Sequence, residues 1–321
     1  MASDKKPCRV NTLAGPDRVV NKPALAILTL DVDLPGMTAL PAATALGPAT
    51  LRVADEGRAL ALYRDLIGLK VIERTNGKIA LGAGGKPFLY LDVVPGTLPR
   101  PRHTTGLYHV AILLPDRAAL GQAIARLMGA GIKLGAADHK VSEAIYLWDA
   151  DNNGLEIYRD RPRADWQWND GLVTMGNAPL DFAGLLAEAA RRPASAHVPA
   201  GSRIGHVHLQ VGDIEEAERF YCGILGFERT AEWRGALFVS AGGYHHRLGL
   251  NVWESKNGPP PPQTAAGLEQ FVIELPGELD VAAVRARIEI AGLPVEKSDG
   301  AFVVRDPWQT AIRMAPMRTG G

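Results

Sequence analysis

The stretch GLYHVAILLP, residues 106–115, has the continuous apolar pattern of a strand buried inside a sheet. An amphipathic helix is expected next, from Arg117 to Ala130, because apolar residues recur there at helical spacing. Two further strands are expected within SEAIYLWDADNNGLEIY, residues 142–158. A tight turn separates them, for which Asn153-Gly154 is a strong signal because both residues tolerate positive φ. The stretch therefore predicts one βαβββ unit.

Two polar residues stand out within these apolar strands. His109 lies in the first strand of the unit and Glu156 in the last. If the two strands are neighbours, both side chains can point into one concave face. An imidazole and a carboxylate held on rigid strands are two thirds of a mononuclear non-haem iron site.

Outside this unit, the chain contains an internal repeat. Four landmarks recur with a spacing of 158 residues: Val53 and Val211, Asp55 and Asp213, Tyr63 and Tyr221, Gly68 and Gly226. Each has a physical role: the strand ends at an Asp that can cap the next helix, the helix presents an aromatic residue on its inner face, and a Gly ends it. Such a fixed spacing is hard to obtain by chance.

A second correspondence extends the repeat to the whole chain. The segment GLEQFVIELP (267–276) matches 106–115, and an Ala-rich helix ending at a glycine follows each of them. The strand 306–314 matches 149–157 in the same way. We therefore expect an α+β chain of four βαβββ modules, at about 46–97, 105–162, 203–256 and 266–316.

The expected domain organisation follows from these modules. Residues 1–45 form an irregular N-terminal extension rich in Pro, Gly and Ala, with one short strand at 25–32. The first pair of modules occupies 46–162 and the second pair 203–316. Between them, residues 163–202 are a linker with Trp166, Trp168 and a short helix at 179–191.

Composition excludes several classes of protein. The 321 residues suit about two domains, and 46% hydrophobic with 22% charged residues is ordinary for a globular protein. The formal net charge is zero and there is no Lys/Arg run, so nucleic acid is not an expected partner. The N-terminus lacks a signal-peptide pattern, and the apolar segment at 24–34 is too short to span a membrane. Two distant cysteines, Cys8 and Cys222, fit a reducing cytoplasm.

Several motifs together resemble those of the vicinal oxygen chelate superfamily. They are GHVHLQVGD (205–213), Phe220-Tyr221, Gly226-Phe227 and DNNGLEIY (151–158). Within that superfamily the chain is most similar to the type I extradiol ring-cleaving dioxygenases of the catechol 2,3-dioxygenase-like group, also through SAGGYHH (240–246). The resemblance covers about residues 46–316. It implies two cup-shaped mixed β-sheets with flanking helices, and a catechol as substrate.

The resemblance also implies where metal ligands lie: in the first strands of two paired modules and in the last strand of one. Those positions hold Pro48, His109, His206 and Gln270 in the first strands, and Glu156 and Arg313 in the last strands of modules two and four. Modules two and three therefore carry the ligand set His109, Glu156 and His206 for Fe(II), or for Mn(II). We expect them to pair, leaving modules one and four as a metal-free cup. If modules pair one with two and three with four instead, neither cup has three ligands, and His246 or His208 would have to substitute.

Further residues are candidates for proton transfer and substrate contact. His suits acid–base work near neutral pH, and His246 is the first candidate, with His139 the second and Tyr146 a donor to an oxygen-derived anion. We expect His245, Tyr244, His208 and Tyr158 to line the substrate site. His208 shares a strand face with His206 and is an alternative ligand. Each of these histidines could instead be a hydrogen-bonded core or loop residue.

Three hypotheses for function are compatible with these observations. The leading one is extradiol cleavage of a catechol by O₂ at a 2-His-1-carboxylate Fe(II) site. A metal-dependent glyoxalase-like isomerase or lyase is the second, although it usually needs two carboxylates. The third is a non-catalytic protein that binds small molecules in the cup. The metal-free cup and the linker around Trp166 and Trp168 are possible surfaces for a homo-oligomer.

Overall fold

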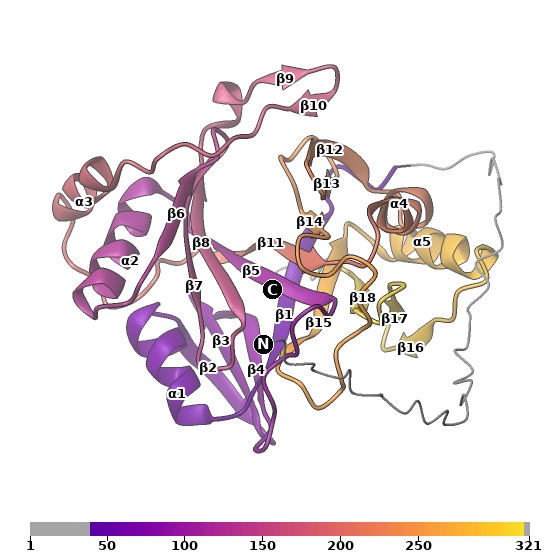
Figure 1. Cartoon of the computed structure of the whole chain (residues 1–321), viewed down its shortest axis with the longest axis horizontal. Helices are drawn as coiled ribbons and strands as arrows, with labels where there is room; N and C mark the ends of the chain where they lie inside the picture. The colour runs from indigo at the N-terminus through magenta and orange to yellow at the C-terminus, as the bar shows by residue number, and fades with distance from the viewer. Residues whose placement is uncertain (1–38, 318–321) are drawn as a thin grey trace, which may run out of the picture. The chain divides into compact units, whose positions relative to one another are not determined.

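The computed structural model describes residues 39–317. The strand predicted at 25–32 lies outside the described residues. Four βαβββ modules follow one another along the chain, and their strands form two curled mixed sheets of eight strands each, as expected from the repeat (Figure 1).

Modules one and two occupy the N-terminal half of the described chain. Module one contains β1 (Ala45–Val53), α1 (Glu56–Leu60), η1 (Ala61–Leu66), β2 (Lys70–Thr75), β3 (Lys78–Ala83) and β4 (Lys86–Val93). Module two contains β5 (Gly106–Leu113), α2 (Arg117–Gly129), β6 (Gly135–Asp138), β7 (Ser142–Trp148) and β8 (Gly154–Asp160). The linker contains η2 (Arg163–Asp165), β9 (Trp168–Asn169), β10 (Leu172–Val173) and α3 (Phe182–Ala190).

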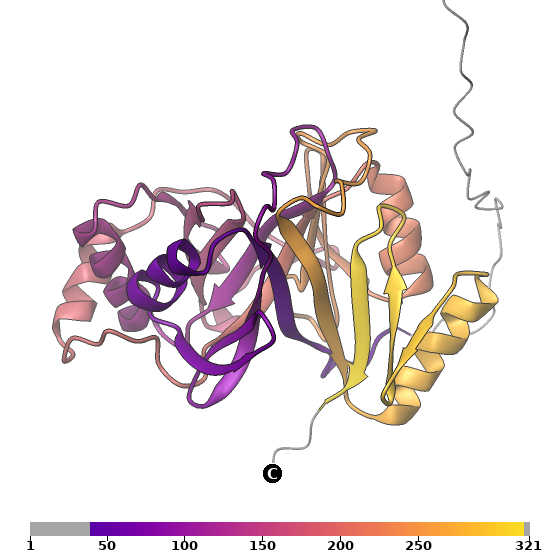
Figure 2. The ribbon, with the colours of Figure 1, turned by 90° about the horizontal axis from the view of Figure 1, so that it is seen from below.

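Modules three and four repeat the pattern. Module three contains β11 (Arg203–Gln210), α4 (Ile214–Glu218), η3 (Arg219–Ile224), β12 (Glu228–Trp233), β13 (Ala236–Ser240) and β14 (Leu248–Asn251). Module four contains β15 (Gly267–Leu275), α5 (Glu278–Ile290), β16 (Glu296–Ser298), β17 (Ala301–Arg305) and β18 (Ala311–Pro316). Helix α5 covers the outer face of its own strands (Figure 2).

The modules pair as the ligand count predicted. One sheet has the order β12-β13-β14-β11-β5-β8-β7-β6, so it joins modules three and two; we call it sheet 2–3. The other has the order β16-β17-β18-β15-β1-β4-β3-β2 and joins modules four and one; we call it sheet 1–4. Each junction is an antiparallel pair of first strands, β5 with β11 and β1 with β15. The prediction that modules two and three pair is confirmed.

The predicted landmarks of the repeat perform the same tasks in both halves. The Asp55 carboxylate accepts a hydrogen bond from the Arg58 N–H, and Asp213 accepts one from the Glu216 N–H, so each caps its helix. Gly68 and Gly226 both turn the chain with a φ of 92°. The repeat goes further than the sequence predicted, because η1 and η3 are both π-helical segments with the same spacing.

The buried tyrosines of the repeat link modules that lie in different sheets. The Tyr63 hydroxyl donates to Asp149 Oδ2 at 2.8 Å, joining module one to module two. The Tyr221 hydroxyl donates to Asp306 Oδ2 at 2.9 Å, joining module three to module four. Because the sheets join modules two with three and one with four, these two bonds connect all four modules in a closed ring.

The buried carboxyl of Asp306 makes stability depend on pH. Burial raises its pKa to about 6, although backbone N–H groups and the Tyr221 hydroxyl donate to it. In the unfolded chain an Asp ionises near about 3.9. Folding therefore favours the protonated carboxyl, and this contribution is full below about pH 4 and is lost as the pH rises through about 6. At about 1.4 kcal/mol per tenfold change in proton affinity, the loss is about 3 kcal/mol.

An Asp306→Asn variant, uncharged at every pH, is expected to escape this loss. Its amide oxygen can still accept from the Trp308 and Thr310 N–H groups, while its amine donates to Tyr221. Relative to the wild type, its free energy of unfolding in urea should rise by about 2–3 kcal/mol between pH 4 and pH 8. Asp213→Asn is the control, because it makes the same change from carboxylate to amide at a residue outside the Tyr221–Asp306 contact, and its amide oxygen can still cap α4. Parallel pH profiles for wild type and Asp306→Asn would contradict the prediction.

Candidate metal centre and its surroundings

Three buried side-chain atoms that could bind a metal ion, the candidate ligands, converge on the concave face of sheet 2–3. Glu156 Oε2 lies 2.9 Å from His109 Nε2 and 3.0 Å from His206 Nε2, and the two imidazole nitrogens are 3.3 Å apart. The three residues are at most 6% exposed. Within residues 39–317 this is the one group of three His, Cys, Asp or Glu side chains close enough to share a metal ion.

Strand register explains this convergence. On adjacent strands, His206 of β11 is paired with Ala111 of β5, and Ala111 in turn with Glu156 of β8. The side chains of one such row point to the same face of a sheet. The methyl group of Ala111 leaves room for the two larger side chains to meet above it, while His109 reaches the same point from the next position on that face. The ligand cluster thus depends on a small residue at its centre.

The turn between β7 and β8 is present as predicted, but the residue in it that takes positive φ is a different one. The residue with positive φ is Asn152, at 66°, rather than Asn153 or Gly154. The turn is stabilised by Asp149 Oδ1, which accepts from the N–H groups of Asp151 and Asn153. Gly154 is extended instead, and a Cβ there would lie 2.0 Å from the Tyr108 carbonyl oxygen. Because Gly154 has no side chain, β8 can lie close to β5 at the place where the candidate ligands meet.

The protonation of the cluster suits a divalent cation. Burial alone would raise the pKa of Glu156, but the adjacent imidazoles of His206 and His109 outweigh burial and hold that pKa well below its ordinary value. Burial lowers the pKa of His109. A carboxylate and neutral imidazoles are the forms that bind metals. Two imidazoles and one carboxylate are also the ligand set of mononuclear non-haem iron oxygenases, so the residues present fit Fe(II).

His208, the alternative ligand, is held away from this cluster. Its Nε2 lies 3.0 Å from Asn251 Nδ2, which donates to it. Its ring lies against Gly249, where a Cβ would be 2.8 Å from the His208 ring. The ring also contacts those of His109, Tyr108 and Trp253. His208 is 4% exposed, so it packs beside the ligand His109 as part of the wall of the cup.

His139 and Tyr146 form a hydrogen-bonded pair beside the ligands. His139 Nε2 lies 2.6 Å from the Tyr146 hydroxyl, and its Nδ1 lies 2.9 Å from the Gly176 carbonyl oxygen. A carbonyl only accepts, so Nδ1 carries a proton and, in the neutral ring, Nε2 accepts from Tyr146. Tyr146 is paired with Glu156 across β7 and β8. Burial and the Glu156 carboxylate raise the pKa of Tyr146 well above its ordinary value, so the phenol stays protonated.

A second group of polar residues lies on the other side of the ligands. The His246 ring lies 4.2 Å from the His206 ring, centroid to centroid. Its Nδ1 is 2.8 Å from His245 Nδ1, and His245 Nε2 is 2.8 Å from Asp160 Oδ1. Burial lowers the pKa of His246 well below its ordinary value, as do the neighbouring imidazoles of His206 and His245. His246 is therefore neutral at pH 7.

Three residues predicted to contact substrate, His245, Tyr244 and Tyr158, form a buried hydrogen-bonded network with Asp160 beside this group, and their contact with substrate stays a prediction. His245 is 0% exposed, and both of its ring nitrogens are in hydrogen bonds. Tyr244 donates from its hydroxyl to Asp160, and the Tyr158 and Tyr244 hydroxyl oxygens lie 2.8 Å apart. Because the single proton of Tyr244 goes to the carboxylate, Tyr158 donates to Tyr244. His246 and Tyr158 are the members of this group whose rings lie nearest to His206, at 4.2 and 4.8 Å between centroids.

The linker passes from module two to module three over this region. The Ala178 and Asp138 backbones form an isolated antiparallel bridge, and β10 contacts β12 at the other edge of sheet 2–3. Figure 1 shows the β9–β10 hairpin beyond the end of β8, on the side of β12. Trp166 is buried against Tyr244 and His245. The expectation that Trp166 offers an oligomer surface was therefore wrong, since this chain itself covers the ring; Trp168 is 43% exposed.

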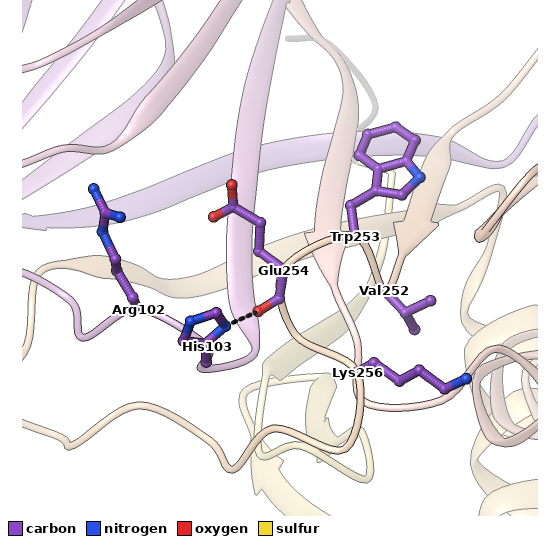
Figure 3. Close-up of a pocket in the computed structure, with 6 residues that line it drawn as sticks. All are labelled: Arg102, His103, Val252, Trp253, Glu254 and Lys256. Carbon is purple, nitrogen blue, oxygen red and sulfur yellow. Dashed lines mark hydrogen bonds between the residues drawn. The ribbon is translucent and has the colours of Figure 1, made fainter.

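A pocket of about 270 Å³ lies at the rim of the cup, where the loops after β4 and β14 meet. Figure 3 shows Arg102 and His103 on one loop and Val252, Trp253, Glu254 and Lys256 on the other, with His103 Nδ1 3.2 Å from the Glu254 carbonyl oxygen. The Trp253 ring forms the border with the cup, because it contacts the rings of Tyr108 and His208. Sequence reasoning missed this contact, which depends on two loops far apart in the chain.

Sequence reasoning also missed Asp160, although a signal for it existed. Glu156, Tyr158 and Asp160 alternate along β8, and alternating residues share one face of a strand. Asn251, which donates to His208, is the last residue of β14, just as Asp160 is the last residue of β8. In sheet 1–4, by contrast, the ligand positions hold Pro48, Gln270 and Arg313, and Arg313 donates to Ser298.

Comparison with known proteins identifies the class to which this fold and site belong. Residues 45–157 and 203–313 match the family model of the Glyoxalase/Bleomycin resistance protein/Dioxygenase superfamily. The chain belongs to this superfamily. The first matched segment covers modules one and two and the second covers modules three and four, so both halves of the repeat carry the family pattern.

Individual relatives and solved structures are more specific than the family model. The chain is 44% identical over 276 residues to a catechol-2,3-dioxygenase of Bacillus subtilis (strain 168), covering 84% of this chain and 96% of that protein. Among solved structures, a putative dioxygenase of Bacillus subtilis subsp. subtilis str. 168 aligns with a TM-score of 0.62 at 14% identity, over 88% and 87% of the two chains. Glyoxalase I from Zea mays aligns with a TM-score of 0.51 at 15% identity, over 85% and 92%. These two structures share the fold.

No helix among residues 39–317 combines the length and apolar character that a membrane span requires.

Proposed function

We propose that this protein is an extradiol dioxygenase that opens the ring of a catechol with O₂ at a mononuclear Fe(II) site. The observation that carries the proposal is the convergence of His109 Nε2, His206 Nε2 and Glu156 Oε2 in a buried cup between two acid–base candidates. The relative that is 44% identical and named catechol-2,3-dioxygenase supports the same reaction. Mn(II) accepts the same ligand types.

In this proposal His109, His206 and Glu156 hold the metal. Fe(II) held by these residues would supply the redox chemistry by which the diol reduces O₂. The set offers one carboxylate, whereas glyoxalase-like proton shuttling usually needs two, and this favours ring cleavage over isomerisation. The apolar residues Ala111, Leu113 and Ala144 pack on the same face and keep water from the reacting ring.

The acid–base work falls to the two imidazoles on either side of the ligands. His246, neutral at pH 7, takes a catechol proton at Nε2, the nitrogen that its bond to His245 leaves free. It later returns that proton to the departing oxygen. On the other side, Tyr146 donates a hydrogen bond to His139 in the resting protein and can turn it toward an oxygen-derived anion. His208 packs against His109 and limits the space for the ring.

The test uses the colour of the product. Purified protein is loaded anaerobically with Fe(II), mixed with catechol in air, and followed by absorbance and by O₂ uptake. Cleavage next to the hydroxyls gives a yellow semialdehyde with one O₂ consumed per ring, whereas cleavage between them gives a colourless diacid. Protein loaded with redox-inert Zn(II) is the control. If Fe(II)-loaded protein consumes no O₂ with catechol or its simple alkyl and halogen derivatives, the proposal is wrong.

A further inference from the structure

The Asp160 carboxylate lies at the end of a hydrogen-bonded chain that leads to the proposed base. Asp160 Oδ1 lies 2.8 Å from His245 Nε2, and His245 Nδ1 lies 2.8 Å from His246 Nδ1. The carboxylate is also held by the Tyr244 hydroxyl, at 3.0 Å from Oδ2. His245 is fully buried, so neither of its nitrogens can exchange its partner for bulk water.

Donor and acceptor rules determine where the protons of this chain lie. An ionised carboxylate only accepts, so His245 Nε2 carries a proton and donates it to Asp160. In neutral His245, Nδ1 is then an acceptor. The 2.8 Å contact between the two Nδ1 atoms needs one proton, which must come from His246. Neutral His246 is therefore protonated on Nδ1 and unprotonated on Nε2.

His246 Nε2 is the nitrogen that faces no partner. Among residues 39–317 it makes no hydrogen bond, while the His246 ring lies against the rings of the ligand His206 and of Phe238. An unprotonated nitrogen beside the ligand cluster is what a base for a catechol hydroxyl requires. The opposite tautomer would place a proton on that nitrogen and remove its basicity.

We propose that Asp160 is a positioning residue that, through His245, keeps the basic nitrogen of His246 unprotonated and oriented for catalysis. This inference rests on the proposed function, in which His246 is the base. When His246 takes a proton at Nε2, the positive charge is shared with His245 and stabilised by the Asp160 carboxylate. The only bonds that change are bonds to hydrogen: the catechol O–H breaks as the His246 Nε2–H forms, and the Nδ1 proton of His246 is shared with His245 Nδ1 along their hydrogen bond.

Asp160→Asn tests the proposal because the amide has nearly the same shape but carries a donor. With its amine turned to His245 Nε2, it would move the His245 proton to Nδ1 and the His246 proton to Nε2. The same change in a Ser-His-Asp triad lowers kcat about 10⁴-fold through the wrong tautomer. Because Asp160 acts here through a second imidazole, we expect kcat for catechol to fall about 100-fold with KM and Fe(II) content unchanged. Asp116→Asn, which removes an ion pair with Arg192 away from the cup while its amide oxygen can still cap α2, should leave kcat unchanged.

The second readout is independent of activity and of the metal. In metal-free protein with ¹⁵N-labelled histidine, His246 is assigned by comparison with His246→Gln, and its two nitrogens are classified as protonated or unprotonated by NMR. The wild type should be protonated on Nδ1 and the Asp160→Asn variant on Nε2. A wild type protonated on Nε2 overturns the proposal even if the variant fails to fold.

The outcomes separate this proposal from the proposed function. If the wild type cleaves no catechol but shows the expected tautomers, the reaction is wrong and the role of Asp160 in orienting His246 stands. A fall in kcat without a change of tautomer would mean that Asp160 is merely structural and would overturn the proposal. A rise in KM with kcat unchanged would overturn it too, since it would place Asp160 in contact with substrate.

Discussion

Glu156→Gln is expected to abolish metal binding and, with it, ring cleavage. The amide has the shape of the carboxylate but no charge, so the two imidazoles lose the anion that lies 2.9 and 3.0 Å from them. Loss of a mere outer-shell partner already lowers metal affinity about 10–100-fold, and loss of a direct ligand should exceed that. After anaerobic loading and dialysis, the iron content should fall to background.

A thermal measurement checks the same prediction without relying on turnover. A ligand present at 100 times its Kd stabilises the folded state by about 2.7 kcal/mol, so Fe(II) should raise the Tm of the wild type and leave that of Glu156→Gln unchanged. Arg313→Gln is the matched control, because Arg313 holds the corresponding strand position in sheet 1–4, where the described residues bring no three ligand-type side chains together. If Glu156→Gln keeps stoichiometric iron and its Tm shift, the ligand assignment is wrong.

His246→Gln is expected to retain iron and lose turnover. Glutamine can occupy the volume of the ring and hydrogen-bond to His245, but it cannot take up a proton near neutral pH. General acid–base catalysis contributes about 10²–10⁴-fold, so kcat should fall within that range. The KM for catechol should change little, because in the proposal the metal and the cup bind the ring.

The control for this variant is His197→Gln, which alters an exposed linker histidine and should leave kcat unchanged. Iron content and the Fe(II)-dependent Tm shift establish that the ligand set is intact. Iron-replete His246→Gln with wild-type kcat would show that His246 is not the base, and the His139–Tyr146 pair would become the next candidate. Loss of iron instead would show that His246 contributes to metal binding.

The sequence, read with the family resemblance, was sufficient to predict the cluster of His109, Glu156 and His206 that the structure brings together, and the pairing of modules. His109, Glu156 and His206 occupy equivalent positions of a repeat, and strand alternation puts such positions on one face. Only modules two and three together supply three ligands, so counting ligands predicted a sheet that the structure confirms. Helix caps and glycine turns were equally predictable, because they depend on residues close in sequence.

The contacts around the ligands were decided by tertiary structure alone. Asp160 meets His245 across 85 residues, and Trp253 reaches the cup from a loop at the far end of module three. Trp166 is buried because the linker crosses to Tyr244. Loops carry no hydrophobic period, so nothing local predicts which distant strand they will meet. The alternation of residues along a strand is enough to predict which face of the sheet a candidate ligand occupies. The groups that orient a base come from separate segments, so their contacts depend on how those segments pack together.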